Sequence, residues 1–262
     1  MAIIQILLTL FLFLLPLGVV LRLEIIPSVY VYPTDLIAGL ILIYTIYKFV
    51  NSKKLFSKEL FYPLSLFVIV GFISLLIGSR FLTITQFLSS FAYLLRFVAY
   101  ASIVFCFRFV PKDFIKKTNV KLIIVGLVSV VFGFLQFFYY PNLRNLYYLG
   151  WDDHLYRLFG TFLDPNFAGA FLALVFLFLL ENCILTVSKI ENLKRVGLYL
   201  LTFFTLVSVF LTYSRSAFIM LLVGLTVLLL SHKFYKWTIL GVVFVVILFS
   251  LFANTKIEKS IS

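Results

Sequence analysis

The chain has 262 residues, of which 63% are hydrophobic and only 12% are charged, and its formal net charge is +12. Soluble domains have about a quarter of their residues charged, so this composition excludes a soluble globular protein. Most of the Lys and Arg residues lie in short links between apolar runs, as the positive-inside rule describes for membrane proteins, so no nucleic-acid partner is expected.

Apolar segments recur along the whole chain, and their lengths suit helices that cross a bilayer. The sequence therefore predicts an all-α, polytopic transmembrane bundle, with residues 1–262 forming a single transmembrane domain. The first segment lacks a basic start and a small-residue cleavage site, which indicates a retained span rather than a signal peptide. The nine predicted spans are 3–21, 34–50, 61–78, 86–108, 119–139, 166–182, 196–213, 216–231 and 237–253.

The charge of the links predicts the topology. Fourteen of the twenty-two basic residues fall in four alternate links, which include 48–58 and 108–121. Placing these links in the cytoplasm predicts a cytoplasmic N-terminus and an extracytoplasmic C-terminus. The segment 140–165 then becomes the one long outer loop, and its Tyr and Trp residues are typical of the headgroup level.

Two arginines, one before and one in the middle of the 86–108 span, need an explanation. Arg96 falls near the middle of that span, where an arginine is costly and indicates a functional site. No acidic residue lies in any predicted membrane core, so its expected partner is an anion brought from elsewhere. The alternative is pairing with backbone carbonyls or snorkelling. Arg80 lies on the predicted outer side, just before this span.

The outer loop ends in a polar cluster at the mouth of the 166–182 span. Asp164 and Pro165 suit the first turn of a helix, where Asp caps free amides and Pro is favoured. Capping does not account for Asn166 or for Arg157, seven residues before Asp164. His154 in the same loop is a weak candidate for a general base, oriented by Asp152 or Asp153.

A second polar group, LTYSRSAF at 211–218, separates two adjacent spans. Arg215 there is either a snorkelling side chain or part of a site. Together with Arg157, Arg80 and Arg96 it predicts a positive pocket on the outer face. Arginine forks suit phosphate oxygens, and a helix N-terminus favours an anion. The expected ligand is a lipid pyrophosphate or a similar anion, with no metal and no cofactor.

These two polar groups resemble the signatures of the O-antigen ligase and O-antigen polymerase family, which are membrane glycosyltransferases of the GT-C type. The first signature is R-x-x-G-x-x-x-(D/N)-P-N, and the second is T-x-S-R followed by a small residue. The matching residues are Arg157, Gly160, Asp164, Pro165 and Asn166, and then Thr212, Ser214, Arg215, Ser216 and Ala217.

The resemblance implies an inverting transfer at the outer leaflet of the bacterial inner membrane. The donor is a glycan on undecaprenyl pyrophosphate, and the acceptor is the lipid A core for a ligase or a second lipid-linked glycan for a polymerase. Arg157 and Arg215 would hold the donor pyrophosphate. The family continues into a large outer loop with a catalytic histidine, so we expect a partial chain without that base. The competing functions are a lipid-linked oligosaccharide flippase and a non-catalytic membrane subunit.

Overall fold

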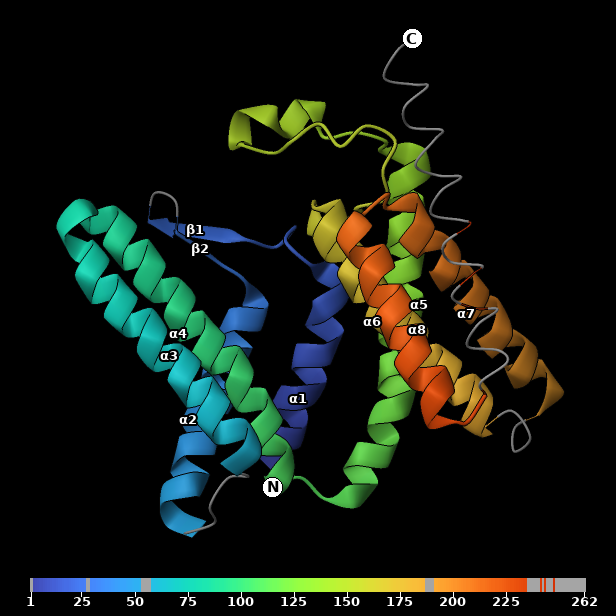
Figure 1. Cartoon of the computed structure of the whole chain (residues 1–262), viewed down its shortest axis with the longest axis horizontal. Helices are drawn as coiled ribbons and strands as arrows, with labels where there is room; N and C mark the ends of the chain where they lie inside the picture. The colour runs from blue at the N-terminus through green and yellow to red at the C-terminus, as the bar shows by residue number, and fades with distance from the viewer. Residues whose placement is uncertain are drawn as a thin grey trace. The chain divides into compact units, whose positions relative to one another are not determined.

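The computed structural model describes residues 2–26, 29–52, 58–186 and 191–234, together with the isolated helical positions 241, 243 and 247. These residues are predominantly helical (Figure 1). The chain divides into two compact units, Met1–Lys121 and Leu122–Ser262, and the division falls within one helix. This division does not test whether residues 1–262 form a single transmembrane domain, which stays a prediction.

Unit 1 contains α1 (Ala2–Leu14), α2 (Pro33–Ser52), α3 (Lys58–Gly78), α4 (Ile84–Cys106) and the first residues of α5 (Lys112–Tyr139). Its core joins α1, α2, α4 and the start of α5 through residues such as Ile4, Ile41 and Phe114. By contrast, α3 has a single buried residue, Leu75. A helix that is apolar and almost wholly exposed is suited to contact with lipid.

A small hairpin interrupts the helices of unit 1 and was not predicted. Strands β1 (Leu23–Ile26) and β2 (Val29–Val31) pair antiparallel between α1 and α2. Figure 1 shows the hairpin between α4 and α1. The predicted span 3–21 is correspondingly shorter, because α1 ends at Leu14 and a 3-10 turn over Leu15–Leu17 follows.

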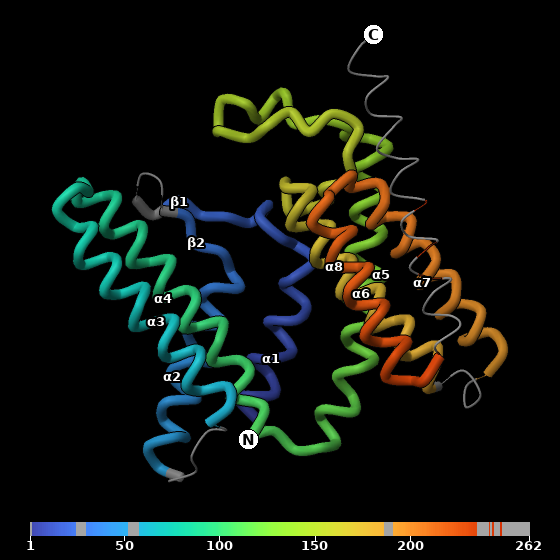
Figure 2. Tube along the Cα trace, in the orientation of Figure 1, coloured from blue at the N-terminus to red at the C-terminus, as the bar shows by residue number. Residues whose placement is uncertain are grey.

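Unit 2 is built from the rest of α5 with α6 (Pro165–Thr186), α7 (Asn192–Leu211) and α8 (Arg215–Ser231). Figures 1 and 2 show α6 beside α8 in this unit. In α6, 50% of an apolar stretch of 18 residues is buried, whereas in the corresponding stretch of α3 only 6% is buried. This explains why the sequence of α6 is apolar on every face, since both α7 and α8 pack on it.

Six described helices are long and apolar enough to cross a membrane, and they correspond to the predicted spans from 34–50 to 196–213. The helices matching 3–21 and 216–231 are apolar but shorter. The ninth predicted span, 237–253, and the C-terminal end lie outside the described ranges apart from three isolated positions. A multi-pass membrane protein follows from the six helices, while nine spans and the orientation of the termini remain predictions.

Candidate functional site

The first turn of α6 is built by Asp164, which caps the helix. Its Oδ1 accepts hydrogen bonds from the backbone N–H of Asn166 at 2.6 Å and of Phe167 at 3.2 Å. Pro165 occupies the first helical position, where its missing N–H leaves no bond unmade. Asn166 is exposed, so its side chain is available at the positive end of the helix dipole.

The turn between α7 and α8 is built by two hydroxyl side chains that are 0% exposed, those of Thr212 and Ser214. Thr212 Oγ1 donates to the Val209 carbonyl at 2.7 Å and accepts from the Ser214 N–H at 3.3 Å. Ser214 Oγ accepts from the Ala217 N–H at 3.3 Å and so caps α8. Arg215 is therefore the first residue of α8, and it is exposed.

The two helix starts meet at Gly169, in the first turns of α6. A Cβ added there would lie 2.7 Å from Ala217 Cβ, 2.8 Å from Thr212 Oγ1 and 3.2 Å from Ser214 Cβ. Small residues permit close helix approach of this kind in membrane proteins. The 164–169 segment and the 212–217 turn, far apart in the sequence, thus form one local structure.

Arg157 joins this structure through its guanidinium. Its Nε donates to the Thr212 carbonyl at 2.9 Å, and its Nη2 donates to the Tyr213 carbonyl at 3.3 Å. The next residue, Leu158, donates its N–H to the Leu211 carbonyl at 2.8 Å. A guanidinium has five N–H donors, and among the described residues the other three of Arg157 have no hydrogen-bond partner. Burial lowers the pKa of Arg157 and nearby Asp164 opposes that shift, but an arginine stays charged.

Gln136, in the last turn of α5, holds the segment that carries Arg157 and was missed by the sequence analysis. Its Oε1 accepts from the N–H groups of Phe159 at 2.8 Å and Gly160 at 2.9 Å. Its Nε2 donates to the carbonyls of Tyr140 at 2.9 Å and Arg157 at 3.3 Å. The signal available in the sequence was an amide side chain among aromatic and aliphatic residues near the end of the predicted 119–139 span.

Gly160, the glycine of the first signature, has φ +54. This left-handed conformation disfavours residues with a Cβ. The turn it forms directs the chain from the Gln136 contact into the short 3-10 helix Gly160–Phe162 that precedes α6.

His154 lies in the loop between α5 and α6, with its ring 6.3 Å from the Phe159 ring. Burial lowers its pKa, as does the charge of Arg157, while Asp152, Asp164 and Asp153 oppose the shift. The expected orientation by an aspartate is not present in the described residues: Asp153 Oδ2 pairs with Arg144 Nε at 3.4 Å, and no hydrogen bond joins His154 to Asp152 or Asp153. A neutral imidazole can still accept a proton.

The lowered pKa of His154 predicts a pH-dependent stability. The ordinary value is 6.5, so on acidification the unfolded chain binds a proton at this residue before the folded protein does, and the folded state loses stability. Between about pH 7.5 and about pH 5.5, wild type should lose more thermal stability in detergent than His154→Gln. An equal loss in both proteins would contradict the assigned environment.

The expectation that Arg96 has no acidic partner is wrong. Arg96 Nη2 lies 2.7 Å from Asp35 Oδ2 and also donates to the Tyr30 carbonyl. Its guanidinium carbon lies 4.9 Å from the Tyr32 ring centre and 5.1 Å from that of Tyr93. The charge is thus neutralised within unit 1, because the first turn of α2 lies beside the middle of α4.

Arg80 lies in the 3-10 turn Ser79–Phe81 between α3 and α4 and is exposed. Arg80 and Arg96 therefore belong to unit 1, whereas Arg157, Arg215 and Asn166 belong to unit 2. The structure brings Arg157, Asn166 and Arg215 onto one local framework, and this cluster is the candidate site.

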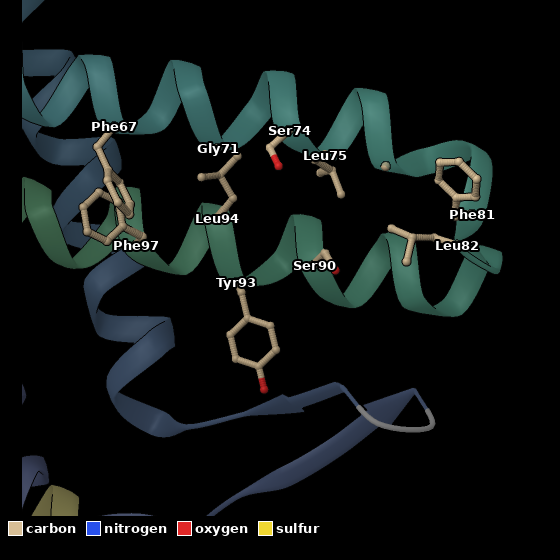
Figure 3. Close-up of a pocket in the computed structure, with 11 residues that line it drawn as sticks. Phe67, Gly71, Ser74, Leu75, Phe81, Leu82, Ser90, Tyr93, Leu94 and Phe97 are labelled. Atoms are coloured by element: carbon tan, nitrogen blue, oxygen red, sulfur yellow. The ribbon is translucent and has the colours of Figure 1, made fainter.

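A groove of 570 Å³ between α3 and α4 is a different kind of feature. Ser74 and Leu94 point into it, while Tyr93 points away from α3 toward the hairpin (Figure 3). No residue of its lining is charged, so it suits a hydrocarbon chain rather than a phosphate. The lining residues are Phe67, Gly71, Ser74, Leu75, Gly78, Phe81, Leu82, Ser90, Tyr93, Leu94 and Phe97.

No protein-family model, curated protein or solved structure matches the chain. Two arginines lie near two adjacent helix N-termini, and helix N-termini and guanidinium groups both favour anions with several oxygen atoms.

Proposed function

We propose that this protein is a membrane glycosyltransferase that acts at the outer leaflet of the bacterial inner membrane. Its donor is a glycan on undecaprenyl pyrophosphate, and its acceptor is the lipid A core or a second lipid-linked glycan. The observation that supports this most is the geometry of Arg157. Two of its donors fix the plane of the guanidinium against the α7–α8 turn, and the remaining donors are free to bind phosphate oxygens.

In the proposed reaction, an acceptor hydroxyl attacks the anomeric carbon from the face opposite the pyrophosphate, which inverts the configuration. The bond from that carbon to the pyrophosphate oxygen breaks, and the lipid pyrophosphate leaves with the electron pair. Arg157 and Arg215 stabilise the charge that develops on it, and the Asn166 side chain and the N-terminus of α6 add favourable potential. His154 is the candidate acceptor of the hydroxyl proton.

The two competing functions make different use of the same residues. A flippase needs basic groups along a path across the membrane, and Arg96, the one described basic residue in the middle of a long span, is paired with Asp35. A non-catalytic subunit would use Arg157 only to cap the C-terminal carbonyls of α7, a role that a lysine can also fill. Arg157→Lys therefore distinguishes a capping role from a bidentate phosphate site.

The test measures binding of farnesyl pyrophosphate, a short lipid pyrophosphate, to the full chain in detergent. Farnesol, which lacks the pyrophosphate, should not compete. Losing one charge-assisted hydrogen bond weakens binding by about tenfold or more, so Arg157→Lys and Arg215→Lys should each show this loss. The matched control is Arg144→Lys, because Arg144 lies in the same loop but is exposed and paired with Asp153.

Equal binding by Arg157→Lys and wild type, or equal competition by farnesol, would contradict the phosphate site. Glycan transfer itself is checked by incubating the protein with an undecaprenyl-pyrophosphate-linked glycan and either acceptor. Formation of free undecaprenyl pyrophosphate together with an extended acceptor is the expected result.

A further inference from the structure

We infer that Gln136 is the positioning residue of the anion site: it fixes the backbone that carries Arg157 and thereby sets the affinity for the donor pyrophosphate. This inference rests on the proposed function. It concerns a residue that belongs to neither signature and lies within a membrane helix rather than in the outer loop.

Every hydrogen-bonding position of the Gln136 side chain is used. A primary amide has two acceptor positions on its oxygen and two N–H donors. The oxygen meets two successive N–H groups, those of Phe159 and Gly160, and the nitrogen meets the carbonyls of Tyr140 and Arg157. Because two donors face one end and two acceptors face the other, the orientation of the amide is determined by its partners.

These contacts hold the loop segment Arg157–Gly160 at both of its ends. The carbonyl of Arg157 is bound at its start, and the amides of Phe159 and Gly160 are bound at its end. Between them, Leu158 is 1% exposed and donates its N–H to the Leu211 carbonyl. The backbone of the segment is therefore fixed on two sides, by α5 and by the end of α7.

The consequence concerns the Arg157 side chain. Its guanidinium donates to the Thr212 and Tyr213 carbonyls from this fixed backbone position. Without Gln136, two N–H groups and two carbonyls lose their partner, and unpaired buried groups are unfavourable. The segment would then move to regain bonds with water, and Arg157 would no longer be held ready for the phosphate. Preorganisation of this kind raises affinity because less ordering is needed on binding.

The experiment compares farnesyl pyrophosphate binding by wild type, Gln136→Leu and Gln136→Glu. The first variant removes all four bonds. The second keeps the acceptor for Phe159 and Gly160 but places a carboxylate oxygen against the Arg157 carbonyl. Both should bind about tenfold more weakly than wild type. The matched control is Gln86→Leu, since the Gln86 amide oxygen accepts from the Thr83 N–H at 2.9 Å in the cap of α4, in unit 1.

A merely structural role would lower the melting temperature of Gln136→Leu and leave its dissociation constant unchanged, and that result would overturn the inference. Equal weakening by Gln86→Leu would overturn it as well. If neither Gln136 variant folds, hydrogen exchange on wild type tests the inference instead. The Phe159 and Gly160 amides should be protected, and rapid exchange there would show that Gln136 does not hold this segment. Failure of wild type to bind farnesyl pyrophosphate would instead contradict the proposed function, whatever the exchange result.

Discussion

Arg96→Ala should destabilise unit 1 by about 1–3 kcal/mol, because removing one member of a partly buried ion pair leaves the other charge without its partner. The side chains of Arg96 and Asp35 are 24% and 13% exposed, and they lie 2.7 Å apart. Asp35 Oδ2 also accepts the Tyr32 N–H at 2.9 Å, so the same carboxylate holds the start of α2. Thermal unfolding in detergent, followed by circular dichroism, measures the loss.

The matched control is Arg80→Ala in the same unit. Arg80 is exposed, and no described acidic residue forms an ion pair with it, so we expect a change within about 0.5 kcal/mol. The double variant Asp35→Leu with Arg96→Met should recover much of the lost stability, because apolar replacement of a whole buried pair is often neutral. If Arg96→Ala unfolds at the same temperature as Arg80→Ala, the pair makes no important contribution.

Gly169→Ala should destabilise unit 2 and weaken pyrophosphate binding together. The new methyl group would meet Ala217 Cβ at 2.7 Å and Ser214 Cβ at 3.2 Å. Neither contact is the far end of a flexible side chain, so the helices must separate. Overpacking of this kind costs about 1–3 kcal/mol, which exceeds the gain of about 0.5–1 kcal/mol from alanine in a helix.

Gly197→Ala in α7 is the control for this prediction, because a Cβ at Gly197 meets nothing within 4 Å. It should keep or slightly raise the melting temperature and leave binding unchanged. Comparing the two variants separates the effect of alanine on helix stability from the effect of a clash where two helices approach closely. A Gly169→Ala protein as stable as Gly197→Ala would show that the first turns of α6 and α8 do not depend on their contact.

The helices were predictable because a bilayer sets their length. The predicted segment 34–50 corresponds to Pro33–Ser52, and 166–182 corresponds to Pro165–Thr186. The cap at Asp164 was predictable too, because it is formed by neighbours in the sequence. The β1–β2 hairpin was not, since its strands have only four and three residues and carry no alternating pattern long enough to recognise.

Two sets of contacts could not be predicted for another reason, namely the pairing of Arg96 with Asp35 and the four hydrogen bonds of Gln136. Each joins residues far apart in the chain, and only the packing of helices decides which of them meet. Asp35 is the second residue of the predicted 34–50 span, and nothing in the sequence indicates that the start of this span lies beside the middle of the 86–108 span. The signatures located Arg157 and Arg215, but they did not indicate that Arg157 contacts the turn that carries Arg215.

The Asp35 carboxylate both accepts the Tyr32 N–H at the start of α2 and pairs with Arg96 of α4, and this has a consequence for biosynthesis. Asp35 leaves the ribosome well before Arg96, so α2 must enter the bilayer while its neutralising partner does not yet exist. We expect the start of α2 and the hairpin to remain in the aqueous interface until α4 is made. Only then can Asp35 move to its final depth as an ion pair. The ion pair of this unit would thus form only after α4 has been inserted, and not at the time when α2 itself is made.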